Sequence, residues 1–157
     1  MSRRTHLILT RQRPVLAIAG AVACLAACSG PVEIDAPELS EADAAACRDF
    51  VDTLPDRVGD QERVESEGAF GAAYGDPPIV VTCGVGKPDH LMTNCTSIDG
   101  VDWYFEESDE ALIATTVGRQ PAIEIVVPAE YDQTAPAQVD LGPAITAHTT
   151  AGQGCTG

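Results

Sequence analysis

Residues 79–85 read Ile-Val-Val-Thr-Cys-Gly-Val, which is the strongest strand signal in the sequence. The residues that share one face of an extended chain here are Ile79, Val81, Cys83 and Val85. A short run rich in β-branched residues, with Asp76-Pro77-Pro78 as a turn signal directly before it, is typical of a strand. The sequence therefore predicts a strand over 79–85 with that face buried in the core.

A hairpin is predicted directly after this strand and the loop that follows it. Asp99-Gly100 lies between two short runs suited to strands, 95–98 and 101–105, and Asp-Gly is a strong signal for a two-residue type I′ turn. Such a turn places Ile98 opposite Val101. The inner face then carries Val101, Trp103 and Phe105, and the outer face carries Cys95, Asp102 and Tyr104.

Two more strands are expected after these. Residues 112–117 and 122–127 are apolar runs separated by a Gly-Arg-Gln-Pro turn. The polar stretch 59–67 is predicted as a loop, with room for a short edge strand around Val64. The sequence contains no internal repeat.

Helices are predicted at both ends of the strands. Ser40-Glu41-Ala42-Asp43 is a capping box, and Pro55 ends the helix that it begins. The apolar stripe of that helix comprises Cys47, Phe50, Val51 and Leu54. A second helix is expected from Ala135 through Leu141, with a further turn at Ile145. The order predicts an α+β fold: an antiparallel sheet of four to five strands with an N-terminal and a C-terminal helix packed on one face.

The first 27 residues match a secretory signal peptide. Four arginines precede an apolar run over 15–26, and Leu25-Ala26-Ala27-Cys28 resembles the bacterial lipobox, in which the cysteine thiol takes up a diacylglycerol. We expect 1–27 to be the signal, 28–39 a flexible tether and 40–157 a single domain. Ser2-Arg3-Arg4 leaves the twin-arginine export route open beside the general one.

The strong negative charge of the chain argues against nucleic acids as partners. The chain from residue 28 onward carries five Lys and Arg against 24 Asp and Glu, a net charge of −19. So acidic a domain repels phosphate backbones and anionic lipid headgroups alike. We therefore expect no nucleic-acid binding, and attachment to the membrane through the lipid on Cys28 alone.

The cysteines predict two disulfides. Cys47, Cys83, Cys95 and Cys155 remain after the signal and the lipidated Cys28 are set aside, and four cysteines allow three pairings. Cys47 shares the helix stripe and Cys83 the buried strand face, so packing of that helix on that face brings the two thiols together. Cys95 lies on the opposite face, where the returning tail can bring Cys155. The predicted bridges are Cys47–Cys83 and Cys95–Cys155.

The sequence contains no recognisable catalytic constellation, metal site or cofactor motif. His90 and His148 lie in polar surroundings, and we expect both to be exposed. The acids from Asp99 to Glu110 lack the spacing of a calcium loop. Gly84-Val85-Gly86-Lys87 lacks the spacing and the Ser or Thr of a phosphate loop. Arg119 is expected to pair with Glu124 or with an acid of 106–110, ahead of the open alternative that it recognises an anion.

Several motifs in order resemble a known family. They are Gly75–Val85, Gly100–Trp103, Val117–Arg119 and Ile123–Pro128. Together they resemble the actinobacterial secreted family catalogued as domain of unknown function 3515, over about residues 47–145, with Tyr74 where family members usually carry Trp. The resemblance implies a lipid-anchored or secreted envelope protein and supplies no catalytic residue. Trp103, Arg119, Asp76 and Asp102 are the structural or interaction candidates.

The sequence thus predicts a lipid-anchored protein at the outer face of the cytoplasmic membrane. Its expected role is that of a non-catalytic accessory or binding domain toward an envelope protein or a cell-wall component. The alternative is an envelope hydrolase that uses acidic residues, which a pair of carboxylates with separated pKa values in one cleft would favour.

Overall fold

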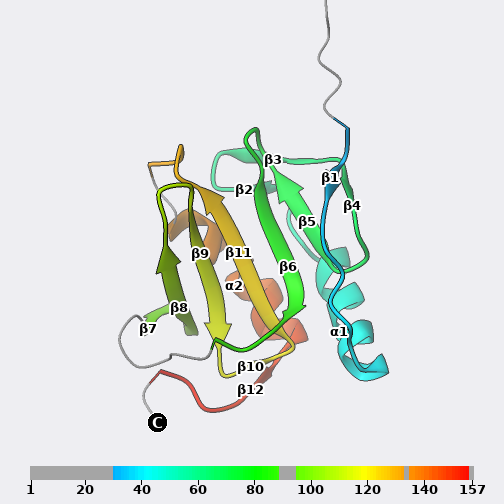
Figure 1. Ribbon diagram of the computed structural model, residues 1–157. Helices are drawn as coiled ribbons and strands as arrows, with labels where there is room; N and C mark the ends of the chain where they lie inside the picture. Colours follow the sequence, from blue (N-terminus) through cyan, green and yellow to red (C-terminus); the bar gives the residue numbers. More distant parts are fainter. Residues whose placement is uncertain (1–29, 89–94, 133–134, 156–157) are drawn as a thin grey trace, which may run out of the picture.

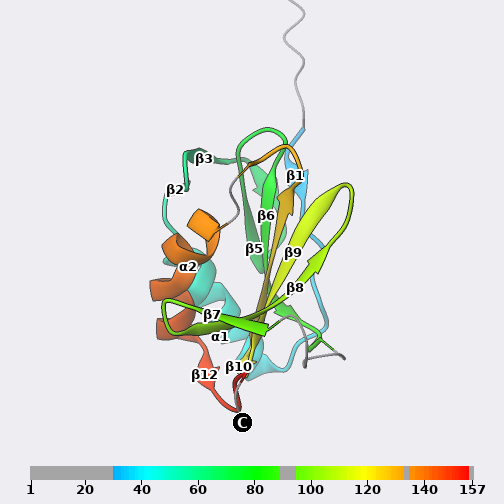
Figure 2. The same ribbon diagram turned by 90° about the vertical axis from the view of Figure 1, so that its left-hand side faces the viewer.

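The fold is α+β, with two helices against one face of a large antiparallel sheet (Figures 1 and 2). The computed structural model describes residues 30–88, 95–132 and 135–155. The predicted signal peptide and Cys28 lie outside these residues. The elements are β1 (Val32–Glu33), α1 (Glu41–Asp52), β2 (Arg57–Val58), β3 (Gln61–Val64), β4 (Ser66–Glu67), β5 (Gly71–Tyr74), β6 (Ile79–Val85), β7 (Cys95–Ile98), β8 (Val101–Glu107), β9 (Ala111–Val117), β10 (Arg119–Gln120), β11 (Ala122–Pro128), α2 (Ala135–His148) and β12 (Thr150–Ala151).

The main sheet has eight strands in the order β2-β3-β5-β6-β11-β9-β8-β7, so the predicted number of four to five is wrong. The central strand β6 has the predicted bounds, with Ile79, Val81 and Cys83 buried. The strands that the prediction omitted lie at the β2–β5 end of the sheet. Gly71–Tyr74 shows no alternation because all four of its residues are buried, so the period-2 signal of a half-buried strand is absent.

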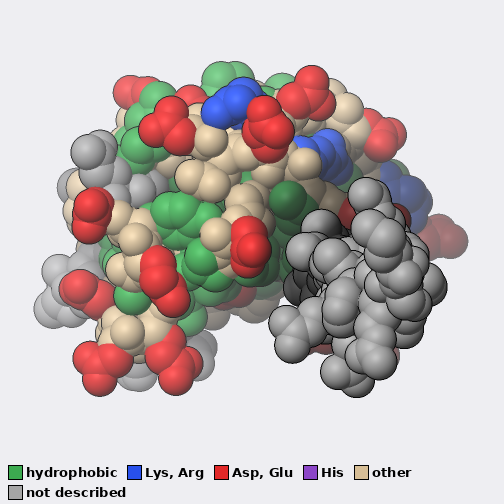
Figure 3. Space-filling view, turned by 90° about the horizontal axis from the view of Figure 1, so that it is seen from above, with side chains coloured by type: hydrophobic (Ala, Val, Ile, Leu, Met, Phe, Trp, Pro, Cys, Tyr) green, Lys and Arg blue, Asp and Glu red, His purple; other side chains and the backbone are tan. Residues whose placement is uncertain are grey.

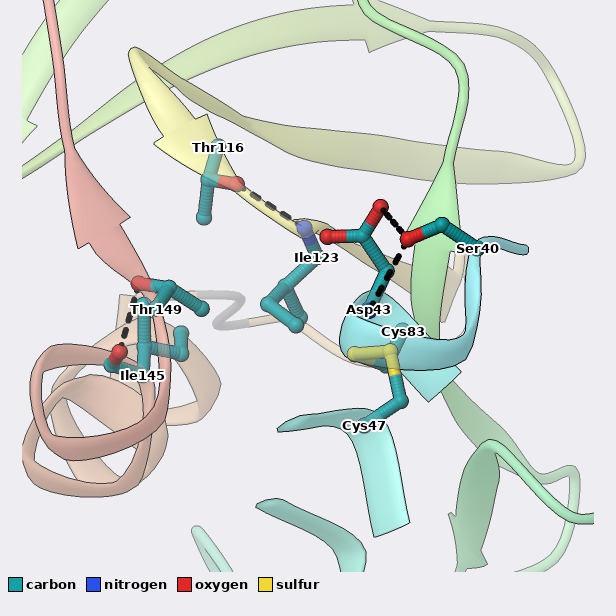
Figure 4. The surroundings of a disulfide bond; sticks show 8 residues. All are labelled: Ser40, Asp43, Cys47, Cys83, Thr116, Ile123, Ile145 and Thr149. Carbon is teal, nitrogen blue, oxygen red and sulfur yellow. Dashed lines mark hydrogen bonds between the residues drawn. A yellow bond between two sulfur atoms is a disulfide. The ribbon is translucent and has the colours of Figure 1, made fainter. Parts of the chain in front are cut away.

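Helix α1 begins where the capping box places it. The Ser40 side chain accepts a hydrogen bond from the backbone N–H of Asp43 (3.1 Å), and the helix ends at Asp52, three residues before Pro55. Its stripe buries Cys47 and Phe50 in the core. The predicted bridge Cys47–Cys83 is confirmed, with a Cα–Cα distance of 5.5 Å, and it ties α1 to β6 (Figure 4).

Helix α2 is one continuous helix of 14 residues, where a short helix and a separate turn were predicted. Pro143 lies inside it and cannot donate the hydrogen bond that the Val139 carbonyl would accept. Both residues are on the exposed side of the helix, where water can hydrogen-bond to that carbonyl. Leu141 and Ile145 on the other side are fully buried in the core, which explains why the helix continues past the proline.

Residues 30–39 lie on the domain, although they were predicted as part of a flexible tether. β1 pairs in parallel with β4 and runs on the side of the sheet opposite the helices (Figure 2). The Ile34 side chain is buried there, beside Thr82 and Val80. Glycine makes this contact possible, since a Cβ on Gly71 would lie 2.8 Å from Ile34 Cγ2. Leu39 covers Gly84 in the same way. The sequence signal missed this docking because one buried isoleucine among prolines and acids has no periodicity.

Candidate functional site

The β7–β8 hairpin positions the second disulfide. Asp99 and Gly100 have φ angles of 47° and 79°, as a type I′ turn requires, and Ile98 pairs with Val101. This register puts Val101 and Trp103 in the core and leaves Cys95 on the outer face. There Cys95 is bridged to Cys155 with a Cα–Cα distance of 5.6 Å, so the second predicted disulfide is confirmed.

Three further contacts hold the C-terminal tail against the sheet. Asp102 Oδ2 accepts a hydrogen bond from the backbone N–H of Cys155 (2.8 Å). The short strands β10 and β12 pair in antiparallel fashion, and the Gly152 N–H donates to the Gly118 carbonyl (2.6 Å). Gly118 has a φ of 67°, and a Cβ at this position would collide with the backbone carbonyl of Gln153. The tail therefore has one defined path across the end of the sheet.

This path encloses a cavity of about 370 Å³, which we call the tail pocket. It lies at the end of the molecule marked by β10 and β12 in Figure 1. Its lining comes from the end of β9, the β10 turn, the tail and the residues after β6. They are Lys87, Pro88, Thr116, Val117, Gly118, Arg119, Gln120, Thr150, Ala151, Gly152 and Gln153.

Two cations, Lys87 and Arg119, line the tail pocket. Arg119 Nη2 donates to the Gly100 carbonyl (3.2 Å), which fixes one side of its guanidinium. The predicted ion pair of Arg119 with Glu124 or an acid of 106–110 is wrong. Among the described residues the salt bridge is Arg57–Glu62, at 2.9 Å. Strand β10 turns away from the main sheet to pair with the tail, and this separates Arg119 from those acids.

Asp102 does not line the tail pocket but holds the tail that forms one of its walls, through its hydrogen bond from the Cys155 N–H. Hydrogen bonds from Ser97 and from the Cys155 N–H lower the pKa of Asp102 below its usual value, and the charge of Arg119 lowers it further. Its carboxylate is therefore ionised at neutral pH. The structure thus brings two of the four candidate residues, Asp102 and Arg119, to the same end of the sheet.

The other two candidates lie elsewhere. Trp103 is fully buried in the core, and its Nε1–H contacts no acceptor within the described part of the chain. It is a core residue and cannot present its ring to a partner. Asp76 lies in the turn before β6, where the Tyr131 hydroxyl donates to the Pro77 carbonyl (2.7 Å) and anchors the turn. That turn is at the end of the sheet opposite the tail pocket (Figure 1).

A larger cavity of about 520 Å³ lies between β2, β3 and the start of α2. Its acidic lining comprises Asp60, Asp132 and Asp140. Asp140 Oδ2 accepts a hydrogen bond from the Gly59 N–H (2.6 Å), so this carboxylate closes the β2–β3 turn against α2. We assign these contacts to the packing of α2.

The helix-free face of the sheet carries a pair of carboxylates. Glu124 on β11 is half-buried and lies beside Thr115 of β9, while Glu106 on β8 is exposed. Burial raises the pKa of Glu124 above its usual value, and the Glu106 charge raises it further, whereas a hydrogen bond with Thr115 acts in the opposite direction. Glu124 also borders a groove of about 510 Å³ between the sheet and residues 33–37.

Within residues 30–88, 95–132 and 135–155, neither helix is long and apolar enough to span a membrane. Among the same residues, no three His, Cys, Asp or Glu side chains come together in a way that could hold a metal ion. His148 ends α2 and is half-buried, and His90 lies outside these residues.

Comparison with known proteins identifies the family. No curated protein and no solved structure matches the chain. A family described as "Protein of unknown function (DUF3515)" matches residues 13–153, which is nearly the whole chain. The chain belongs to this family.

Proposed function

We propose that this family member is a lipid-anchored protein at the outer face of the cytoplasmic membrane, where it acts as a non-catalytic accessory or binding domain. The observation that carries the proposal is the pair of disulfides, Cys47–Cys83 and Cys95–Cys155. Structural disulfides form and persist in oxidising compartments outside the cytoplasm. The lipobox-like Leu25-Ala26-Ala27-Cys28 adds the means of attachment.

The anchor would hold the domain close to the membrane. The Val32 N–H already donates to the Glu65 carbonyl (2.9 Å), so only the residues from Cys28 to Val32 separate the lipid from the fold. These four steps span at most about 14 Å. The end of the domain from which residue 30 leaves would face the lipid, and the tail pocket at the opposite end would face outward (Figure 1).

The charge of the domain fits this arrangement. Figure 3 looks down on the end from which residue 30 leaves and shows acidic side chains spread across it, with a few basic ones among them. Anionic headgroups repel such a surface, so the lipid chains would supply the attachment and the domain would stand off the bilayer. The partner within this proposal is an envelope protein or a cell-wall component on the outward side.

Replacement of Cys28 by Ala tests the anchor. We expect this variant to leave the membrane fraction, because nothing else in the proposal retains it there. Cys24→Ala is the matched control, since Cys24 lies within the predicted signal and would be removed with it. A Cys28→Ala protein that is processed and remains fully in the membrane fraction would overturn the proposal.

The carboxylates of the helix-free face support a second candidate, an envelope hydrolase. Glu124, with its raised pKa, would be the proton donor, and Glu106 would be the second carboxylate of the pair. Turnover of purified cell wall by the protein that disappears in both Glu124→Gln and Glu106→Gln would establish this candidate. No turnover would leave the binding domain as the function. Turnover that both variants retain would contradict both candidates, because the active site would then lie elsewhere on the protein.

A further inference from the structure

We propose that the tail pocket binds the carboxylate of a small, otherwise uncharged molecule, and that the free C-terminus of a short neutral peptide is the class of ligand it takes. The inference deepens the proposed binding function by naming its site and its ligand. It rests on the geometry of the pocket and does not depend on the lipid anchor or on the cellular location.

The distribution of charge gives the first argument. Only five of the residues from 28 onward are Lys or Arg, against 24 acids, and two of the five line this one cavity. Of the other three, Arg57 pairs with Glu62 (2.9 Å), Arg63 lies on β3, and Arg48 is exposed on α1. A pair of cations in one concave site of so acidic a domain creates a local attraction for an anion.

The second argument comes from Arg119, whose guanidinium is held in place by one hydrogen bond while its other N–H donors remain available. One amino group donates to the Gly100 carbonyl, and this is the acceptor that it contacts in the described part of the chain. Arginine has five N–H donors in a planar fork that matches the two oxygens of a carboxylate. Donors thus remain for a ligand on a side chain whose orientation is already set.

The walls of the pocket suit a short peptide. Strand β12 forms a two-stranded sheet with β10, so its other edge pairs with no strand in the described part of the chain, and both of its residues, Thr150 and Ala151, are exposed. A peptide can therefore add to its other edge through backbone hydrogen bonds while its carboxylate reaches Arg119. Val117 and Pro88 supply apolar surface, and Gln120 and Gln153 supply uncharged polar groups. A volume of about 370 Å³ lies at the small end of the range for ligand sites.

The surrounding charges favour a monoanion over phosphate. Asp102 stays ionised behind the tail and offsets part of the Arg119 charge. The domain as a whole repels negative charge, and a phosphate dianion would meet about twice the long-range repulsion that a carboxylate meets. The two cations of the pocket, one of them already partly offset by Asp102, would have to balance both phosphate charges. A ligand with further carboxylates would be excluded for the same reason, which is why the rest of the ligand must be uncharged.

The test uses the oxidised protein with two matched probes, N-acetyl-Ala-Ala-Ala with a free carboxylate and the same peptide as its C-terminal amide. Binding is measured by NMR titration of backbone amides. We expect the acid to bind with a Kd of about 0.1–1 mM, shifting the signals of residues 118–120 and 150–153, and the amide to bind at least about tenfold more weakly. Inorganic phosphate should bind more weakly than the acid.

Variants then assign the binding to the cations. Arg119→Gln and Lys87→Gln should each weaken binding of the acid about tenfold. Arg57→Gln is the matched control, because it removes an arginine far from the pocket, and binding should not change. Emission from Trp103, the only tryptophan in the chain and a fully buried one, checks that each variant is folded. Equal binding of acid and amide, unchanged binding in a folded Arg119→Gln protein, tighter binding of phosphate, or no binding of the acid would each overturn the inference.

Discussion

The bridges Cys47–Cys83 and Cys95–Cys155 both close long loops, with sequence separations of 36 and 60 residues. Judged by loop closure alone they should stabilise the fold almost equally, by about 4 kcal/mol each. Their surroundings differ. Cys47 and Cys83 are fully buried between α1 and β6, whereas Cys95 and Cys155 are half-buried and join an edge strand to the tail.

A bridge contributes to global stability only where the folded structure depends on it. If the core bridge is removed, α1 and β6 must still pack against each other in the folded protein, so the folded chain gains no freedom. The unfolded chain gains all the entropy that the bridge had removed, and the full loss therefore appears in the stability. If the outer bridge is removed, the tail can detach while the sheet stays folded. The native state then regains part of the entropy, and the cost to global stability is smaller. We therefore assign the core bridge to the fold and the outer bridge to the tail pocket.

Removal of the core bridge should have the largest effect. We expect Cys47→Ala with Cys83→Ala to lower the free energy of unfolding by about 4 kcal/mol and Tm by about 15 °C or more, because loop entropy is lost and a small cavity is left. Denaturation followed by Trp103 emission measures this directly. A loss below about 1 kcal/mol would show that α1 packs equally well without its bridge.

Removal of the outer bridge should cost less. We expect Cys95→Ala with Cys155→Ala to lower the free energy of unfolding by about 1–2 kcal/mol, because the tail detaches locally. Hydrogen exchange of Gly152 and Cys155 amides should speed up strongly in this variant, while amides of β6 and β11 stay protected. Equal stability losses in the two double variants would contradict the distinction between the bridges.

Asp102→Asn should have a smaller effect, confined to the tail. The charged acceptor of the Cys155 N–H is lost, and we expect about 1 kcal/mol of weaker tail docking with little change in Trp103 emission. In the unchanged protein the same contact depends on pH. The folded pKa of Asp102 is lowered, so its contribution is complete above the usual pKa of about 3.9 and is lost as pH falls through the lower folded value.

The amide signal of Cys155 reports this titration of Asp102. It should shift at a pH below about 3.9 in the unchanged protein and show no such shift in Asp102→Asn. A midpoint at or above the usual value would mean that the tail contact does not stabilise the ionised carboxylate.

Glu124→Gln should have the smallest effect and the opposite sign. Because the folded pKa of Glu124 is raised, the ionised form destabilises the fold, and stability falls as pH rises from the usual value to the raised one. We expect the amide variant to gain about 0.5 kcal/mol or less at pH 7, since solvent on the open face screens the effect, and to gain nothing at pH 3. Glu124→Gln also changes the hydrogen bond between Glu124 and Thr115. Glu106→Gln leaves that hydrogen bond in place and removes only the neighbouring charge, so it is the control variant. We expect it to gain still less stability at pH 7.

Much of the fold could be predicted from the sequence because its signals are local. Alternation marks β6, the Asp-Gly turn marks the β7–β8 hairpin, and the Ser40 capping box marks the start of α1. The disulfide pairing followed from the same alternation, since it sorts Cys83 and Cys95 onto opposite faces.

The rest could not be predicted because it depends on distant contacts. The strand Gly71–Tyr74 shows no alternation of buried and exposed residues. Ile34 packs against glycines more than 30 residues away. Pro143 lies in α2 at the place where the prediction divided this helix into a short helix and a separate turn. The tail pocket is the clearest case. Lys87, Arg119 and Gly152 are far apart in the chain. The pairing of β6 with β11 brings Lys87 close to the β10 turn, and the outer bridge together with the β10–β12 pairing returns Gly152 to it. The cationic character of Lys87 and Arg119 was visible in the sequence, but their meeting was not.

Peptide binding in the two double-cysteine variants, at a temperature where Trp103 emission shows both to be folded, tests most directly whether the outer bridge builds a binding site. We expect Cys47→Ala with Cys83→Ala to bind N-acetyl-Ala-Ala-Ala as well as the unchanged protein does. We expect Cys95→Ala with Cys155→Ala to lose at least about tenfold in affinity, because the bridge no longer holds the wall formed by residues 150–153. Undiminished binding without the outer bridge would contradict the claim that this bridge builds a binding site.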